Sequence, residues 1–142
     1  MFSREESKKL RQQFWTSFGL VYRRKWILYD TKIKEIQLKF SFDRKQAIVS
    51  IDVVADDELI RAYFFEKLLS LRKILQSEYL PEIIFDENFE LPEGKIISRA
   101  YVQKTGLSIH NRNDWPAAMA FLAENMAKLE EFFQEYRDML EE

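Results

Sequence analysis

The only histidine of the chain lies in a polar stretch whose residue types suit acid–base chemistry. His110 opens the run His-Asn-Arg-Asn-Asp, which occupies residues 110–114. A histidine near a carboxylate can act as a general base or as a metal ligand. Metal sites need several ligands, however, and the chain has no second histidine and no cysteine. A serine nucleophile on a sharp turn would show as G-x-S-x-G, and no such motif occurs. His110 is therefore a general-base candidate without a partner in the sequence.

The same stretch also has the signals of a helix start. Asp114 immediately precedes a long helical pattern, where an N-cap side chain accepts a hydrogen bond from a free backbone N–H. Asn113, one residue earlier, can serve instead. Pro116 falls in the first turn, where a missing N–H costs nothing. Because these signals account for more of the residues, we predict a helix start here rather than an active site.

A metal-dependent nuclease needs only carboxylates and a lysine, and one such set is present. Asp86, Glu93 and Lys95 match the D…(D/E)-x-K pattern, in which acidic side chains hold Mg²⁺ and the lysine positions water. Glu93 and Lys95 flank a predicted turn, however, and do not lie along a central strand. Asp43-Arg44-Lys45 also fits the pattern, but it too lies in a predicted turn. Glycines stand only at positions 19, 94 and 106, which excludes the usual phosphate-binding loops. We therefore expect no catalytic centre, no metal and no cofactor.

A further candidate is nucleic-acid binding by the segment that begins at Tyr22, where aromatic residues and cations alternate. Aromatic rings can stack on bases while arginine and lysine contact phosphates. The favoured alternative is a helix end stabilised by positive charge, with its rings turned to the core. The residues that a nucleic acid would contact are Arg23, Arg24, Lys25, Trp26, Lys32, Lys34 and Lys39.

Charge is distributed unevenly along the chain. Residues 1–50 carry twelve Lys or Arg and five Asp or Glu, whereas residues 51–142 carry ten and nineteen. A nucleic-acid-binding domain usually has an overall basic balance, but the net charge here is −2. We therefore expect the two halves to pack together and complement each other.

Three helices are predicted to frame these residues. The first starts at the capping-box pair Ser3 and Glu6 and carries an apolar stripe that ends at Val21. The second runs from residue 56 or 57 to Pro81, which cannot continue a helix. Its predicted core stripe is Ile60, Phe64, Leu68, Leu71 and Leu75. The third is the strongest pattern, a heptad-like seam. Its members are Trp115, Met119, Leu122, Met126, Leu129, Phe133, Tyr136 and Leu140.

Two strand pairs lie between the helices. Residues 36–42 and 47–54 alternate apolar and polar side chains around a polar turn, which is typical of an antiparallel hairpin. Residues 82–91 and 95–103 form a second pair, and residues 107–110 are predicted to add a short piece to the sheet. The order α-β-β-α-β-β-α predicts a single α+β domain over residues 1–142, with three helices packed mainly on one face of a small antiparallel sheet.

Composition agrees with one compact domain and bears on location. Hydrophobic residues make up 46% of the chain and aromatic residues 15%, which is enough for a core of ordinary size. The absence of cysteine excludes disulfide frameworks and thiolate metal sites. The N-terminal residues have no apolar signal region, and no apolar run approaches the ~20 residues of a membrane-spanning helix. We expect a cytoplasmic protein without membrane contact.

Several long segments together resemble a known family. They are FSREESKKLRQQFWTSFG, RKWILYDTKIKEIQLKFSFDRKQAIVSID, FFEKLLSLRKIL, LPEIIFDENFELPEGKIISR and SIHNRNDWPAAMAFL. The ensemble resembles a bacterial family of unknown function, numbered 4268, and is similar to its free-standing members in Bacteroidetes. Other members of that family follow restriction-endonuclease-like proteins as C-terminal appendages, which implies an association with nucleic acid. The resemblance implies no catalytic residue, because the family has none assigned.

These observations favour a binding or interaction module without catalytic activity of its own. We expect its partner to be another protein or a second copy, contacted through helical surfaces. The alternative is a nucleic-acid-associated protein, either an accessory to restriction or DNA defence or a degenerate metal-dependent nuclease.

Overall fold

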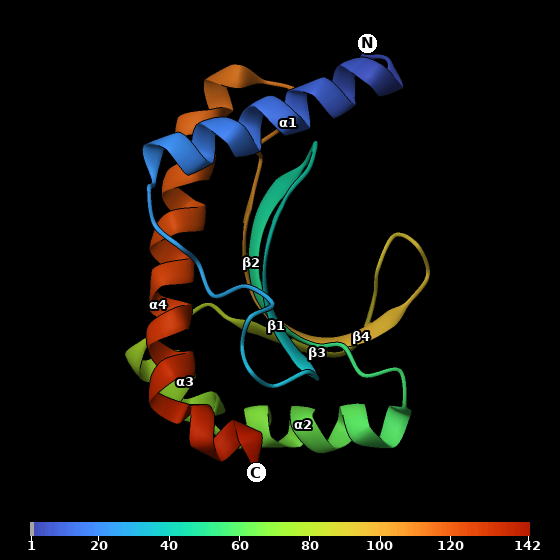
Figure 1. Ribbon diagram of the computed structural model, residues 1–142, viewed down its shortest axis with the longest axis vertical. Helices are drawn as coiled ribbons and strands as arrows, with labels where there is room; N and C mark the ends of the chain where they lie inside the picture. The colour runs from blue at the N-terminus through green and yellow to red at the C-terminus, as the bar shows by residue number, and fades with distance from the viewer. Residues whose placement is uncertain (1) are drawn as a thin grey trace.

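A computed structural model describes residues 2–142 and confirms the predicted α+β class (Figure 1). The elements are α1 (Arg4–Val21), β1 (Ile36–Phe42), β2 (Gln46–Val53), α2 (Glu58–Ser70), α3 (Arg72–Glu78), β3 (Ile84–Glu90), β4 (Ile96–Thr105), the 3-10 turn η1 (Arg112–Asp114) and α4 (Trp115–Glu141). The four strands form one antiparallel sheet in the order β1-β2-β4-β3. Both predicted hairpins are therefore present, and they meet along β2 and β4.

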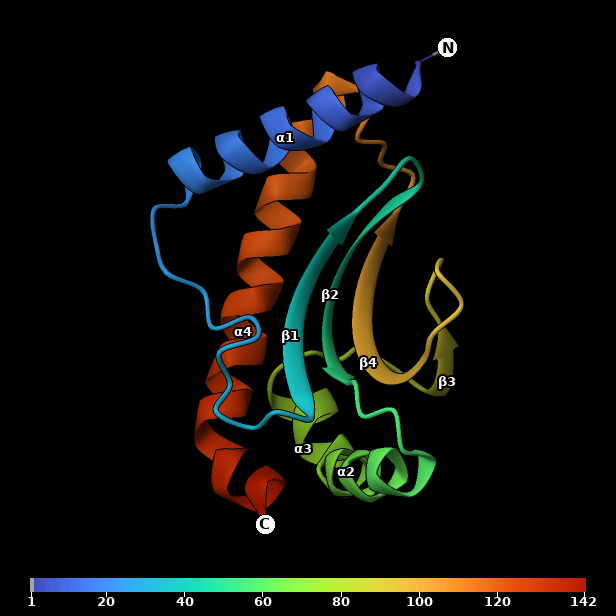
Figure 2. The same ribbon diagram turned by 45° about the vertical axis from the view of Figure 1, so that its right-hand side comes forward.

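The helices pack on one face of this sheet, as predicted. Figure 2 shows α4 running along the sheet, α1 crossing one end, and α2 with α3 lying at the other end. The covered face carries the apolar residues of each strand, for example Val49 opposite Val102. Phe14 of α1 reaches it at Phe42, with ring centroids 4.7 Å apart. One core therefore joins all the helices to the sheet.

The seam predicted in α4 faces this core. Leu122, Met126, Leu129 and Leu140 are each 0% exposed, and Phe133 is 1% exposed. A heptad-like spacing alone does not distinguish a coiled-coil partner from a sheet. Here these residues of the seam pack inside the fold.

Two predicted apolar stripes differ from the structure. Val21, at the end of α1, is 64% exposed. In α2 the predicted Ile60 is 45% exposed, and the buried face instead begins at Arg61 and Phe65. Arg61 is accommodated there because its guanidinium donates to the carbonyl of Ala55 at 3.2 Å.

The single helix predicted for residues 56–80 is two helices, so residues 2–142 form four α-helices where three were expected. The break falls at Leu71. Immediately before it, the hydroxyl of Ser70 donates to the carbonyl of Lys67 at 2.6 Å. Side-chain hydrogen bonds to a carbonyl of the preceding turn compete with the helical ladder and bend helices. After the break, Leu75 points into the core and is 0% exposed.

The segment before α4 also corrects two predictions. Residues 107–110 form no strand, since β4 ends at Thr105 and Gly106 turns the chain with a φ of +79°. Asp114 precedes α4 but makes no side-chain cap, and its Oδ2 accepts a hydrogen bond from the backbone N–H of Ser108 at 2.9 Å instead. The side chain is free to do so because η1 already satisfies the first N–H groups, as Trp115 donates to the carbonyl of Arg112.

The opposite face of the sheet carries no helix, yet its centre is buried. There Arg99 of β4 forms a bidentate ion pair with Asp52 of β2, at 2.8 and 2.9 Å. Phe89 of β3 covers the guanidinium, with the ring centroid 4.4 Å from Cζ. A buried charge pair of this kind adds little net stability, because the cost of removing both charges from water offsets much of their attraction. No helix among residues 2–142 is long and apolar enough to cross a membrane.

Candidate anion-binding site

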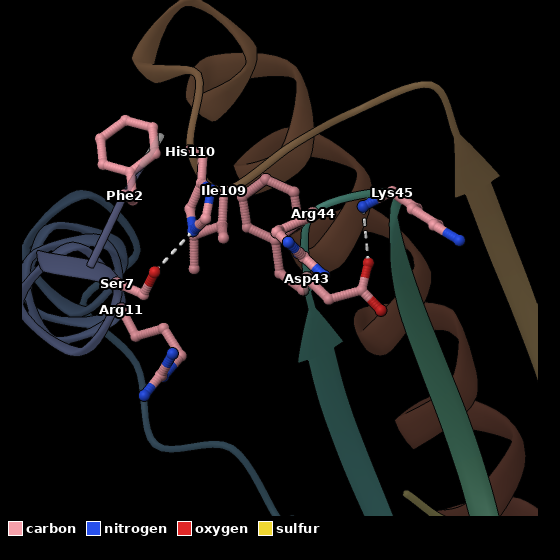
Figure 3. Close-up of a pocket in the computed structure, with 9 residues that line it drawn as sticks. Phe2, Ser7, Arg11, Asp43, Arg44, Lys45, Ile109 and His110 are labelled. Atoms are coloured by element: carbon pink, nitrogen blue, oxygen red, sulfur yellow. Dashed lines mark hydrogen bonds between the residues drawn. The ribbon is translucent and has the colours of Figure 1, made fainter. Parts of the chain in front are cut away.

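A pocket of about 430 Å³ lies where α1, the β1–β2 turn and the segment before α4 meet (Figure 3). It combines a hydroxyl, an imidazole and several cationic side chains with an apolar floor. Its lining residues are Phe2, Ser7, Arg11, Phe42, Asp43, Arg44, Lys45, Ile109 and His110.

The start of α1 brings two of these side chains, Ser7 and Arg11, to the pocket. The predicted capping box is present, since Ser3 Oγ accepts from the Glu6 N–H and Glu6 Oε1 accepts from the Ser3 N–H, both at 3.1 Å. The hydrogen bond from the Ser3 backbone holds the pKa of Glu6 below its ordinary value. Because Ser7 and Arg11 are four residues apart, both lie on the same side of the helix.

The β1–β2 turn is built by its own carboxylate. Asp43 Oδ1 accepts hydrogen bonds from the backbone N–H groups of Lys45 at 2.8 Å and Gln46 at 3.0 Å. This local pairing is the reason aspartate is favoured in such turns. Figure 3 shows the carboxylate of Asp43 directed toward the backbone of Lys45, while the side chain of Arg44 extends toward His110. One oxygen of the only carboxylate that lines the pocket, Asp43 Oδ1, is therefore used by the turn.

His110 is held by contacts on several sides. Its Nε2 lies 3.0 Å from the hydroxyl of Ser7, and the ring of Phe2 packs at a centroid distance of 4.4 Å. Its backbone N–H donates to Ser108 Oγ at 3.1 Å. The neighbouring Ile109 donates its N–H to the carbonyl of Asp43 at 2.9 Å, which ties this segment to the turn. The imidazole is thus fixed at the wall of the pocket.

The cations of the pocket have no carboxylate partners. Arg11, Arg44 and Lys45 form no ion pair with any of residues 2–142. All three are exposed, and Figure 3 shows Lys45 pointing away while Arg44 reaches across the pocket. Guanidinium groups bind phosphate and carboxylate groups through paired hydrogen bonds. Together with the Ser7 hydroxyl, they suit an anion.

The contact between Ser7 and His110 has the distance of a nucleophile and its base. Catalysis of that kind also needs a third group to orient the histidine. His110 Nδ1 makes no hydrogen bond to any of the described residues, and Asp43 bonds to the turn rather than to the imidazole. The arrangement can bind an anion, but it lacks the assembly that would activate Ser7.

The structure places the nuclease candidates apart. Asp86 accepts a hydrogen bond from the Asn88 N–H at 3.1 Å and lies opposite Arg99. Glu93 is exposed in the β3–β4 turn, and Lys95 pairs with Asp56 at 3.3 Å. Lys95 is four residues from Arg99, the residue opposite Asp86, and four residues span roughly 13 Å along a strand. Within residues 2–142 no three or more His, Asp or Glu side chains gather as a metal site would require.

The basic segment after α1 is used by the fold in part. Arg24 pairs with the buried Glu130 of α4, which also accepts from the Ile27 N–H at 2.6 Å. Trp26 packs on Phe18, and Arg24 stacks over the ring of Trp26, with its Cζ 4.0 Å from the ring centroid. The other cations of the segment differ in their contacts. Arg23 donates to a backbone carbonyl, Lys32 pairs with Asp30 at 2.8 Å, and Lys25, Lys34 and Lys39 are exposed without an ion pair among the described residues.

One of the ion pairs among residues 2–142 joins the two charged halves of the sequence, and the expected complementarity of the halves stays a prediction. The Arg24–Glu130 pair joins them, and Arg137 of α4 donates to the carbonyl of Thr31 at 2.6 Å. The lysine beside Asp30 also lowers the pKa of that carboxyl group through a hydrogen bond.

Sequence reasoning found His110 but missed Ser7, Arg11 and Arg44. One signal was available, because Ser7 and Arg11 have the i, i+4 spacing that places side chains on one helix face. Nothing in the sequence, however, showed that this face would meet the β1–β2 turn.

Comparison with known proteins gives a family and no activity. No curated protein and no solved structure matches the chain. The family model described as a domain of unknown function, DUF4268, matches residues 10–137, which include Arg11, Arg44 and His110 but not Ser7. Since this match spans most of the 142 residues, the chain belongs to the DUF4268 family.

Proposed function

We propose that this protein is a cytoplasmic binding module that holds a phosphate-bearing ligand in the pocket beside His110, and that it performs no chemistry on it. The observation that carries the proposal is the pocket itself, in which Arg11 and Arg44 lack acidic partners among residues 2–142. The cytoplasm suits a chain without cysteine.

A phosphate group fits the donors better than a carboxylate does. A phosphate has three or more acceptor oxygens, so that two guanidinium groups and a hydroxyl can each donate to it. The pocket, at about 430 Å³, is within the range of small-molecule sites and exceeds the needs of a bare phosphate ion. The rest of the ligand would lie against Phe2 and Phe42, which line the same pocket.

The phosphate can belong to a small molecule or to a nucleic acid. The second source would make the protein a nucleic-acid-associated module, an accessory to restriction or DNA defence, as the resemblance to a family with members that follow restriction-endonuclease-like proteins suggests. It is supported by Lys45, which extends the cationic surface outside the pocket (Figure 3). Nucleic-acid binding would weaken steeply with salt, because each neutralised phosphate releases counterions. A compact pocket favours the small molecule.

Isothermal titration calorimetry tests the proposal with three probes: inorganic phosphate, adenosine monophosphate and a short single-stranded DNA. We expect saturable binding of the first two and about tenfold weaker binding for each of Arg11→Ala and Arg44→Ala, because a charge-assisted hydrogen bond contributes ~1.5–3 kcal/mol. Lys25→Ala, which removes an exposed cation outside the pocket, is the matched control and should bind as the wild type does.

The outcomes separate the ligand sources. Binding of DNA alone, with a steep salt dependence, would identify the nucleic acid as the partner. Absence of binding for all three probes, or equal losses in Lys25→Ala and Arg44→Ala, would contradict the proposal.

A further inference from the structure

Strand β4 is longer than its neighbour β3, and part of its edge is therefore open. The pairing of β3 with β4 begins at Ile84 opposite Tyr101, whereas β2 pairs with β4 as far as Thr105. The chain turns away before β3, where the Ile83 N–H donates to the carbonyl of Leu80 across Pro81. Residues 102–105 thus have a neighbouring strand on one side only.

The register shows which backbone groups face the open side. Gly106 donates its N–H to the carbonyl of Lys45, the residue just before β2, and the ladder of an antiparallel pair alternates along a strand. Val102 and Lys104 therefore face β2, while Gln103 and Thr105 direct their N–H and C=O groups outward. No hydrogen bond joins these outward groups to any of residues 2–142. Gln103 and Thr105 therefore have backbone N–H and C=O groups without a partner among the described residues, and both residues are exposed.

A groove of about 330 Å³ continues this edge between the sheet and α4. Its apolar lining comes from Val102, Phe121 and Tyr79. Lys128 of α4 and Glu82 also line this groove, and Lys104 is exposed at the edge. An extended chain placed on the edge would have hydrogen-bond partners along its backbone and an apolar recess for a side chain.

We propose that this edge of β4 binds an extended segment of another polypeptide, which adds to the sheet as a strand antiparallel to β4. Main-chain hydrogen bonds to Gln103 and Thr105 would supply the affinity. Every second side chain of the bound segment would face the groove and supply the selectivity. The residue opposite Lys104 would be acidic, since opposite charges pair favourably across strands. Two residues later along the segment, the side chain opposite Val102 would enter the groove and be apolar. The recognised pattern is acidic, any residue, apolar.

A second copy of this chain is the less suitable occupant. Two copies related by a twofold axis can use both outward-facing residues in one register only, with Gln103 opposite Thr105 of the other copy. That register sets Lys104 directly opposite its own copy, and like charges in that position destabilise a pair of strands. Charge therefore favours a foreign acidic segment.

The test begins with a phage-displayed library of random heptapeptides, selected on the full chain. We expect the enriched peptides to share the pattern of an acidic residue two positions before an apolar one. Fluorescence polarisation of one labelled peptide then compares variants. Gln103→Pro removes the outward N–H and leaves the ladder to β2 intact, because proline is tolerated where the N–H faces away from the partner strand. It should weaken binding at least about tenfold, while Gln103→Ala, which keeps the N–H, should not.

Two further measurements make the result decisive. Lys104→Glu should reverse the preference at the paired position from acidic to basic. Methylating the peptide nitrogen that donates to the Gln103 carbonyl should cause a similar loss with wild-type protein, so the test does not depend on the proline variant folding. Failure to enrich the pattern, or unchanged binding by both Gln103→Pro and the methylated peptide, would overturn the proposal. A concentration-dependent dimer that Gln103→Pro abolishes would assign the edge to a second copy and overturn it too.

Discussion

Two cationic regions of this protein have similar residue types but different freedom. In the segment after α1, Arg24 pairs with Glu130 and stacks on Trp26, and the ring of Trp26 packs on Phe18. In the pocket beside His110, Arg11 and Arg44 have no ion pair among residues 2–142. A cation whose charge is already matched within the fold contributes to folding, whereas one without a partner remains available to a ligand. Partners, not residue types, distinguish Arg24 from Arg11 and Arg44. Lys25, Lys34 and Lys39 of the first region also form no ion pair with the described residues, and they differ from the pocket cations in lacking Ser7 and His110 as neighbours.

The largest effect is expected when the aromatic anchor of the first region is removed. Trp26→Ala should lower the free energy of unfolding by ~2–4 kcal/mol, because burial against Phe18 and Phe40 is lost. Urea denaturation measures the change, and Lys25→Ala, one residue earlier, should stay within ~0.5 kcal/mol of the wild type. A Trp26→Ala protein as stable as the wild type would mean that this ring is free to stack on bases.

The next largest effect concerns the carboxylate that neutralises Arg24. Glu130→Ala should lower the free energy of unfolding by ~1–3 kcal/mol, mainly because the Ile27 N–H loses its acceptor. The larger cost of breaking a fully buried pair does not apply, since the Arg24 side chain is 47% exposed and can turn to water. Glu130→Gln keeps an acceptor and should lose less in the same denaturation experiment. Equal losses for the two variants would mean that the stability comes from the charge of Glu130 and not from its hydrogen bond with the Ile27 N–H.

A smaller effect, on affinity alone, is expected from reversing a charge in each region. Arg44→Glu should weaken phosphate binding by more than about tenfold, because it replaces a donor with a like charge. Lys34→Glu, in the first region, should change it less than about twofold, since distant exposed charges are screened by salt. Calorimetry at physiological salt measures both. Similar losses would show a diffuse cationic surface instead of a pocket.

The smallest effect is expected at the start of α1, which carries Ser7 and Arg11 to the pocket. The pKa of Glu6 is lowered in the folded protein, so its ionised form contributes stability above the unfolded pKa. That contribution is lost as the pH falls through the folded pKa. The wild type should therefore be more stable than Glu6→Gln at neutral pH, and the thermal melts should converge once the pH has fallen below the lowered pKa of Glu6. A difference that persists in acid would contradict this role for Glu6.

The fold was largely predictable because its signals are local. The alternation from Ile36 to Phe42 predicts a strand without knowledge of its neighbours, and the seam of α4 predicts a buried helix face. Two of the errors arose where a polar side chain forms a hydrogen bond that the apolar pattern does not reveal. Ser70 bonds to a carbonyl of its own helix and accompanies the break at Leu71, while Asp114 bonds to Ser108 instead of capping α4.

The candidate site was less predictable, because it is assembled from three separate segments. His110 stood out as the only histidine, but its neighbours in sequence are not its neighbours in space. Ser7 and Arg11 come from α1 and Arg44 from a turn that the sequence marked only as polar. The open edge of β4 was equally hidden, since it depends on how far β3 extends.

The central claim is that the free cations beside His110 form the binding site and that the basic segment after α1 does not. A titration with inorganic phosphate, followed residue by residue in amide nuclear magnetic resonance spectra, tests it most directly. The account predicts that the largest shifts fall on Ser7, Arg44 and His110 and disappear in Arg44→Ala. Shifts concentrated between Arg23 and Lys39, or shifts unchanged by Arg44→Ala, would contradict it.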